Sequence, residues 1–236
     1  MISNFRKVIM FITTTILLYS CQKNVDRVNN SDMVDINGNS YPTTSIGSQI
    51  WAAQNLDVNR YRNGDIIPHI TNDSVWATLT TGAWCYYNND STLGKTYGKL
   101  YNHFAVTDPR GLSPEGWRVG SDSDWHILSN YLGGDSLSVG KMKESGTTHW
   151  LIKNDLGTNS SGFTGIPSGV RGEDGSFVQI GNTAWWWSSN FIPEHNCSAA
   201  SGKIRGINGE NISHSGNLVV AITKVVYGLS VRCVKN

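Results

Sequence analysis

The segment that most constrains the fold is residues 114–132, PEGWRVGSDSDWHILSNYL, because it combines a helix start, an apolar helical face and a helix stop. Ser121 lies three residues before Asp124, a spacing that lets the Ser hydroxyl accept a backbone N–H while the Asp carboxylate bonds back to the backbone. An apolar set follows at the spacing of one helical face: Trp125, Leu128 and Leu132. Two glycines at 133 and 134 suit a left-handed helix end. The segment predicts a strand ending near Val119, a tight turn and a helix of about three turns.

Outside this segment, glycine is abundant and helical periodicity is rare. The 236 residues include 25 glycines, and short apolar stretches alternate with polar turns. The pair Asn37-Gly38, between two short strand-like stretches, is the strongest local hairpin signal. There is no internal repeat and no shift of composition after residue 34. We therefore predict an α+β fold: a single loop-rich domain, residues 34–236, with small twisted antiparallel sheets and one or two short helices.

The first 20 residues have the pattern of an export signal rather than of folded structure. Arg6 and Lys7 precede an apolar run, residues 8–18, that is too short to span a bilayer. Residues 18–21, Leu-Tyr-Ser-Cys, resemble the lipobox at which bacterial lipoproteins are cleaved and lipidated. We predict a lipoprotein signal peptide at 1–20, lipidation of Cys21, and a polar, flexible tether through residue 33. The alternative is an ordinary secretory signal with an accidental cysteine.

The charge balance excludes one large class of partners. Removal of the signal takes away two of the 19 basic residues and none of the 18 acidic ones, which leaves a net side-chain charge of −1. A nearly neutral chain without a basic run lacks the cluster of positive charge that is typical of nucleic-acid-binding proteins. Membrane association is therefore assigned to the lipid on Cys21 alone.

Three cysteines remain after Cys21, an odd number for an exported protein: Cys85, Cys197 and Cys233. One disulfide with a free thiol is possible, and so are three free thiols. We predict a disulfide between Cys197 and Cys233, because both fall in the C-terminal β region. The spacing excludes a C-x-x-C metal or redox motif.

The most suggestive binding feature is the triplet Trp185, Trp186 and Trp187. Flat indole rings could form a stacking platform for a sugar. In a strand, alternation sends Trp186 to one face and its two neighbours to the other, so at least one face packs in the core. The three residues are kept as candidate ligand-binding residues, with core packing as the alternative.

Other polar groups point to structure rather than chemistry. Asp122 and Asp124 sit at a helix start, where capping explains them. Two acidic loops could bind Ca²⁺ but suit turns better, and they contain Asn88, Asn89, Asp90, Glu173 and Asp174. None of the six histidines has the spacing of a metal site. The sequence predicts no metal, no cofactor and no catalytic residue.

Several motifs together resemble the Fibrobacter succinogenes major paralogous domain family. They are found along nearly the whole mature chain: IWAAQNL at 50–56, YGKLYN at 97–102, PEGWRV at 114–119, SDSDW at 121–125, KMKESGTTHW at 141–150, GFTGIPSGVRGEDGSF at 162–177, WWSS at 186–189 and SVRCV at 230–234. The pattern departs at Gly120, where relatives have Pro, and at Ser113, where many have Cys. Residues 196–224 match it poorly.

This resemblance implies a C-type-lectin-like fold, related to the sulfatase-modifying factors, on exported proteins and lipoproteins of Gram-negative bacteria. We expect a lipid-anchored protein of the cell envelope, in the outer membrane, that acts as a non-catalytic binding module for a glycan or a surface partner. The alternatives are an extracytoplasmic enzyme or a structural subunit of an envelope assembly. The oligomeric state is not predicted.

Overall fold

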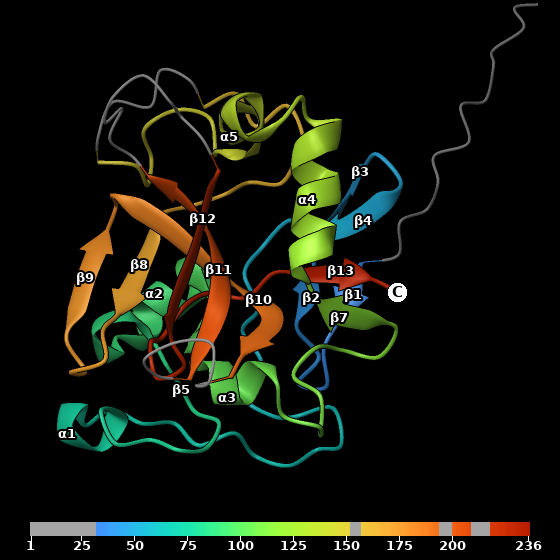
Figure 1. Ribbon diagram of the computed structural model, residues 1–236. Helices are drawn as coiled ribbons and strands as arrows, with labels where there is room; N and C mark the ends of the chain where they lie inside the picture. The colour runs from blue at the N-terminus through green and yellow to red at the C-terminus, as the bar shows by residue number, and fades with distance from the viewer. Residues whose placement is uncertain (1–31, 152–156, 194–199, 209–217) are drawn as a thin grey trace, which may run out of the picture. The chain divides into compact units, whose positions relative to one another are not determined.

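A four-stranded antiparallel sheet joins strands from the start, the middle and the end of the domain. In the computed structural model, which describes residues 32–151, 157–193, 200–208 and 218–236, the strand order is β3 (Thr43–Ile46), β4 (Gln49–Ala52), β13 (Cys233–Lys235) and β7 (Trp117–Val119) (Figure 1). The predicted signal peptide, Cys21 and most of the predicted tether lie outside the described residues. The described residues form one compact unit.

A short hairpin precedes this sheet. Strand β1 (Met33–Val34) pairs with β2 (Ser40–Tyr41), and Gly38 has a φ of +83°, so the predicted turn is confirmed. Met33, predicted as the last residue of the tether, is instead paired in β1 and only 1% exposed. Its side chain packs in the core with Tyr41, so the folded part begins one residue before the predicted boundary.

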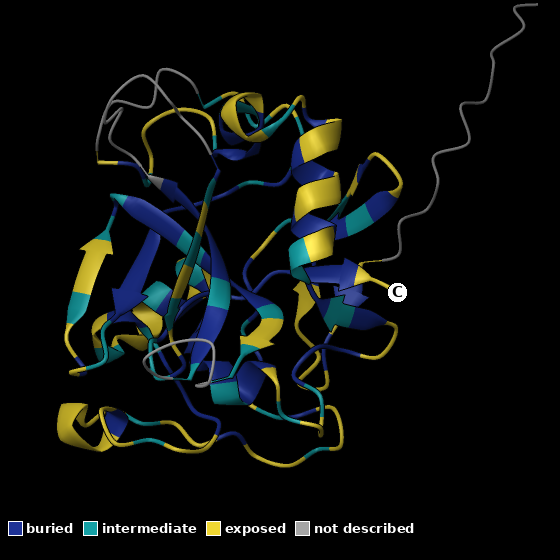
Figure 2. Cartoon of the chain, viewed as in Figure 1, coloured by how far each residue is buried: buried dark blue, intermediate teal, exposed yellow. Residues whose placement is uncertain are grey.

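The second sheet carries the main helix. It contains β10 (Thr183–Ile192), β11 (Ser201–Asn208) and β12 (Val219–Lys224), all antiparallel. Helix α4 (Asp122–Tyr131) has the predicted capping box, and Gly133 follows with a φ of +101°. The buried side of α4 shares one apolar cluster with Trp186 of β10, Ile207 of β11 and Trp51 of β4. Figure 2 shows that the other side of α4 carries exposed residues.

The remaining elements are short. They are α1 (Asp73–Trp76), β5 (Trp84–Cys85), the 3-10 turn η1 (Tyr87–Asn89), α2 (Ser91–Tyr97), β6 (Leu100–Tyr101), α3 (His103–Val106), α5 (Asp135–Met142), β8 (Ser168–Arg171) and β9 (Phe177–Ile180). The α+β class with small antiparallel sheets is confirmed, and α4 and α5 are the two longest helices described. Within the described ranges, no helix has the length and apolar character needed to cross a bilayer.

A buried guanidinium ties these parts together. Arg232, the residue just before β13, is fully buried. Its guanidinium donates to the Asn55 side chain at 2.7 Å. It also donates to the backbone carbonyls of Ala52, Phe163 and Thr164, at 2.9, 2.6 and 2.8 Å. No carboxylate among the described residues pairs with it, and burial lowers the pKa of Arg232 to about 9.

Asn55 is the second centre of this network. Its Oδ1 also accepts the indole N–H of Trp186 at 2.9 Å, and its Nδ2 donates to Ser230 Oγ at 3.2 Å. The network therefore joins residues of four separate sequence motifs: Asn55, Phe163, Thr164, Trp186, Ser230 and Arg232. The motif residues at these positions therefore stabilise the fold.

Candidate functional site

The tryptophan triplet divides between the core and an open groove. Trp186 and Trp187 are fully buried, and their indole N–H groups donate to Asn55 Oδ1 and to the Tyr101 carbonyl, the latter at 2.7 Å. This corrects the prediction that all three rings could contact a ligand. Alternation along β10 places Trp187 and Trp185 in contact with one core cluster and Trp186 in the other. Trp185 alone of the triplet is partly exposed.

Trp185 lines a groove of about 340 Å³ between the hairpin β8–β9 and the sheet β10–β11–β12. We call this cavity the Trp185 groove. Its lining comes from all five of those strands and the chain after them: Val170, Val178, Gln179, Trp185, Ile204, Ile222, Thr223, Tyr227 and Leu229. Figure 2 shows β9, on one side of it, as largely exposed.

A glycine on the neighbouring strand positions the Trp185 ring. Trp185 and Gly206 are directly opposite in the pairing of β10 with β11. A Cβ added at Gly206 would lie 2.2 Å from Cε3 of the indole, so the ring rests on the glycine backbone itself. The ring is therefore held rigidly by one side while it lines the groove with the other, a low-entropy surface for a ligand.

The polar groups of the groove are uncharged. Gln179 accepts a hydrogen bond from Thr183 Oγ1 through Oε1 at 2.9 Å, which leaves its amide N–H groups available to donate. The indole N–H of Trp185 has no hydrogen-bond partner in the part of the chain described. The hydroxyls of Thr223 and Tyr227 complete the set. Lys224, the last residue of β12 and the residue after Thr223, forms an ion pair with Glu173, so its charge is compensated.

Gln179 also has an unusual backbone. Its φ is +69°, a left-handed conformation that is uncommon for a residue other than glycine and rarer still within a strand. Such strain persists only where the surroundings enforce it, and it concentrates at functional sites. The hydrogen bond to Thr183 is one contact that holds it here.

The predicted disulfide receives no support. Cys233 is a free, fully buried thiol, and burial raises its pKa to about 12; its predicted partner Cys197 lies outside the described residues. Cys85 is also free and buried, and burial raises its pKa to about 12 as well. Both thiols are therefore protonated and shielded at neutral pH.

The acidic residues at the start of α4 have structural roles, but only Asp124 has the predicted capping role, and Asp122 forms ion pairs with β11 instead. Asp124 accepts from Ser121 N at 2.9 Å and from Arg118 Nη2 at 2.7 Å, and Asp122 pairs with Lys203 at 2.9 Å and with Arg205. Asp90 caps α2, and Asp174 accepts the Ser176 N–H within a turn. Among the described residues, no group of three His, Cys, Asp or Glu side chains could hold a metal ion.

The sequence profile of one family, the Fibrobacter succinogenes major domain, matches residues 44–235. The chain belongs to the Fibrobacter succinogenes major domain family. No curated protein and no solved structure matches it, so the C-type-lectin-like fold stays a prediction. In this member of the family, three residues of the groove, Ile204, Ile222 and Thr223, lie in the stretch 196–224 that matches the recurring motifs poorly.

Sequence reasoning missed most of the groove. Alternation along a strand was enough to separate Trp185 from Trp186. Gln179, Tyr227 and Ile222 carry no local signal, because the groove forms only where the hairpin β8–β9 packs beside the three-stranded sheet. The turn at 173–176, which joins β8 and β9, was the one available hint of that wall.

Proposed function

We propose that this protein is a lipid-anchored binding module of the cell envelope that holds a neutral glycan in the Trp185 groove. The observation that carries the proposal is a partly exposed indole, fixed on Gly206, in a groove whose lining side chains are uncharged. The apolar C–H face of a pyranose packs on an indole ring. Sugar oxygens can accept from the Trp185 N–H and the Gln179 amide, while Thr223 and Tyr227 can both donate and accept.

The absence of formal charge in the lining supports a neutral ligand over a charged one. An acidic or basic ligand would lose its hydration here without gaining an opposite charge. A sugar exchanges its water hydrogen bonds for those of the groove and buries its apolar face. An extended peptide of a surface protein has similar donors and acceptors, but it gains less from a single flat ring.

The proposed location in the cell envelope follows from the sequence of the amino terminus. The lipobox at residues 18–21 supports cleavage before Cys21 and acylation of its sulfur, and Gln22 after it supports delivery to the outer membrane. Several acyl chains on one cysteine anchor a protein firmly, since each buried CH₂ contributes about 0.8 kcal/mol.

An extracytoplasmic enzyme is a weaker candidate for this groove. Acid–base or nucleophilic catalysis needs at least two convergent reactive groups within hydrogen-bond reach. Tyr227 is the one titratable side chain among the described residues that line the groove. No contact among the described residues specifically supports a structural role in an envelope assembly.

A glycan array followed by titration tests the binding proposal. The native protein is expected to bind neutral oligosaccharides, and Trp185→Ala is expected to lower the affinity at least about tenfold, equivalent to about 1.4 kcal/mol. Tyr131→Ala removes an aromatic ring that is 66% exposed on α4, and it should leave the affinity unchanged. An array without any neutral ligand, or equal losses in both variants, would contradict the proposal.

Lipidation and membrane location are tested separately. Mass spectrometry of the protein extracted from membranes should find a chain that begins at an acylated Cys21, and Cys21→Ser should release the protein from the membrane. Protease treatment of living cells then divides surface-exposed from periplasmic protein. An unmodified amino terminus in the membrane fraction argues against lipidation.

A further inference from the structure

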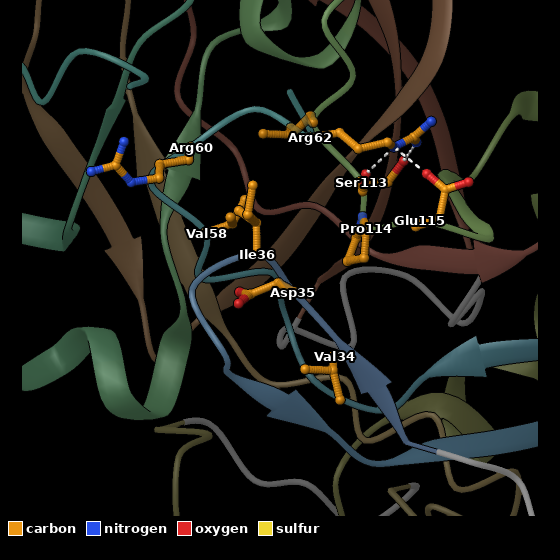
Figure 3. Close-up of a pocket in the computed structure, with 10 residues that line it drawn as sticks. Val34, Asp35, Ile36, Val58, Arg60, Arg62, Ser113, Pro114 and Glu115 are labelled. Atoms are coloured by element: carbon orange, nitrogen blue, oxygen red, sulfur yellow. Dashed lines mark hydrogen bonds and ion pairs between the residues drawn. The ribbon is translucent and has the colours of Figure 1, made fainter. Parts of the chain in front are cut away.

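A second cavity, of about 260 Å³, lies where the chain enters the fold (Figure 3). Its walls are largely aliphatic, with two arginines at the rim. The lining residues are Val34, Asp35, Ile36, Val58, Arg60, Arg62, Leu112, Ser113, Pro114 and Glu115. The cavity is separate from the Trp185 groove, because the two share no lining residue.

Two of the apolar side chains that line this cavity are exposed to solvent. Val34 is 55% exposed and Ile36 is 48% exposed, whereas Met33 and Asp35 between and beside them are buried. Alternation at the start of the hairpin thus directs two β-branched side chains outward. Surface residues of this kind in a folded protein are ordinary when isolated, but a pair beside a cavity with aliphatic walls forms a continuous apolar surface.

Two carboxylates, Asp35 and Glu115, share the lining with the two arginines, but neither forms a close ion pair with them among the described residues. Asp35 is turned into its own hairpin, where its carboxylate accepts from Asn37 N, Asn39 N, Asn39 Nδ2 and Tyr41 Oη at 2.6 to 2.9 Å. Glu115 is 92% exposed on its side chain and only reaches Arg62 at 4.0 Å, a contact of little strength.

The two arginines are spread apart. Arg62 is fixed by hydrogen bonds to the Ser113 carbonyl and hydroxyl, both at 3.0 Å, and Arg60 donates to the Gly64 carbonyl at 2.9 Å. In Figure 3 their guanidinium groups lie on opposite sides of Val58 and Ile36, with that of Arg62 beside Ser113 and Glu115. Diverging cations cannot clasp one small anion, but they can meet separate anions on an extended surface.

We propose that Val34, Ile36, Arg60 and Arg62, here named the entry surface, rest on an anionic lipid bilayer. The proposal rests on the lipidation of Cys21. Met33 is twelve residues from Cys21, and twelve residues span at most about 42 Å, so the entry surface is held close to the membrane that contains the acyl chains. A contact that is weak for a free protein becomes populated at the high effective concentration that such a tether produces.

The chemistry of the entry surface suits this occupant. Aliphatic side chains enter the boundary between headgroups and acyl chains, and arginines on their flanks keep their charged ends at the phosphates. Anionic lipid attracts the two guanidinium groups further. The Trp185 groove, with uncharged lining, offers no such attraction.

The test uses the full lipidated protein in vesicles of phosphatidylcholine and phosphatidylglycerol, with Cys197→Ser to remove one native thiol. An environment-sensitive fluorophore is attached at Ile36→Cys, and in the matched control at Val178→Cys, which is 45% exposed on β9. The label at position 36 is expected to shift to the blue and to be quenched several-fold by a quencher carried on lipid chains, while the label at 178 is not quenched.

Charge is tested by Arg60→Gln and by vesicles without phosphatidylglycerol; each should reduce quenching at position 36 by at least half while the protein still floats with the vesicles. Floating protein with an unquenched label at 36, or equal quenching at 36 and 178, overturns the entry surface and leaves lipidation intact. Quenching that depends only on the protein-to-lipid ratio identifies a second copy of the chain and also overturns it. Protein that does not float overturns the lipid anchor and the entry surface together.

Discussion

At the scale of single residues, Arg232 is the position on which the fold depends most. Its guanidinium satisfies three backbone carbonyls and Asn55 in the interior. In Arg232→Lys, one ammonium would replace the planar fork and leave buried carbonyls without a donor. We expect a loss of about 3 kcal/mol in the free energy of unfolding, measured by urea denaturation. Arg60→Lys, which loses one backbone contact at the surface, should change it by less than about 1 kcal/mol.

The two buried thiols give a second test at this scale. Burial raises the pKa of both Cys85 and Cys233 to about 12, so neither forms the reactive thiolate at pH 8. Alkylation of the native protein should leave both unmodified, and alkylation in urea should modify both, as read from peptide masses. Recovery of a Cys197–Cys233 cross-linked peptide without reductant would show instead that the disulfide predicted from sequence forms.

At the scale of elements, the start of α4 should govern part of the acid sensitivity. Burial raises the pKa of Asp124, but hydrogen bonds from Arg118 and Ser121 outweigh it and hold the pKa below its ordinary value. A depressed pKa stabilises the fold above the unfolded-state pKa of about 3.9, and that contribution is lost as pH falls further through the folded pKa. Asp124→Asn should therefore cost about 1 to 3 kcal/mol at pH 7 and progressively less below pH 4.

Urea titrations at pH 7 and at pH 3 measure this difference. Asp135→Asn is the matched control, because Asp135 also lies in the first turn of a helix but is exposed. A cost for Asp124→Asn that is the same at both pH values would contradict the role given to the ionised carboxylate.

The connection between β7 and α4 leaves no room for a side chain at Gly120, the position where the family pattern has proline. A Cβ at Gly120 would lie 2.7 Å from Cη2 of the buried Trp51, and the Gly120 N–H donates to the Arg232 carbonyl at 3.1 Å. Gly120→Ala should lower the free energy of unfolding by about 1 to 3 kcal/mol, and Gly120→Pro by more because the donor is lost. Gly172→Ala, which meets only the exposed Asp174 side chain within 3 Å, should have a smaller effect in the same thermal or urea measurement.

These elements also show what a sequence alone can predict. Helix α4 was predictable because its cap, apolar face and glycine stop are all local. Helix α5 was not, because Gly134 at its start makes no side-chain cap and packing of Val139 and Met142 holds it in place. The Trp185 groove was half predictable: one strand's alternation selects the ring, but the opposite wall depends on how the hairpin β8–β9 packs beside the sheet and on the left-handed backbone of Gln179.

At the scale of the whole molecule, the folded unit is longer than the family match that begins at residue 44. The hairpin at 33–41 adds Met33 and Tyr41 to the main apolar cluster, and both are buried. The Tyr41 hydroxyl donates to Asp35 at 2.6 Å and accepts the Asp57 N–H at 3.0 Å, which ties the hairpin to the loop after β4. The hairpin is therefore part of the core and not an appendage of the tether.

A chain that begins at Thr44 should consequently be much less stable than one that begins at Asp32. Loss of two large buried side chains costs about 2 to 5 kcal/mol each, and the sum approaches the 5 to 15 kcal/mol that stabilises a typical domain. We expect the longer chain to unfold cooperatively in urea and the shorter one to be largely unfolded or to have a far lower midpoint. Met33→Ala in the longer chain, which removes one of the two side chains, should lie between them. Equal midpoints for all three would place the hairpin outside the cooperative unit and restore residue 34 or later as the start of the fold.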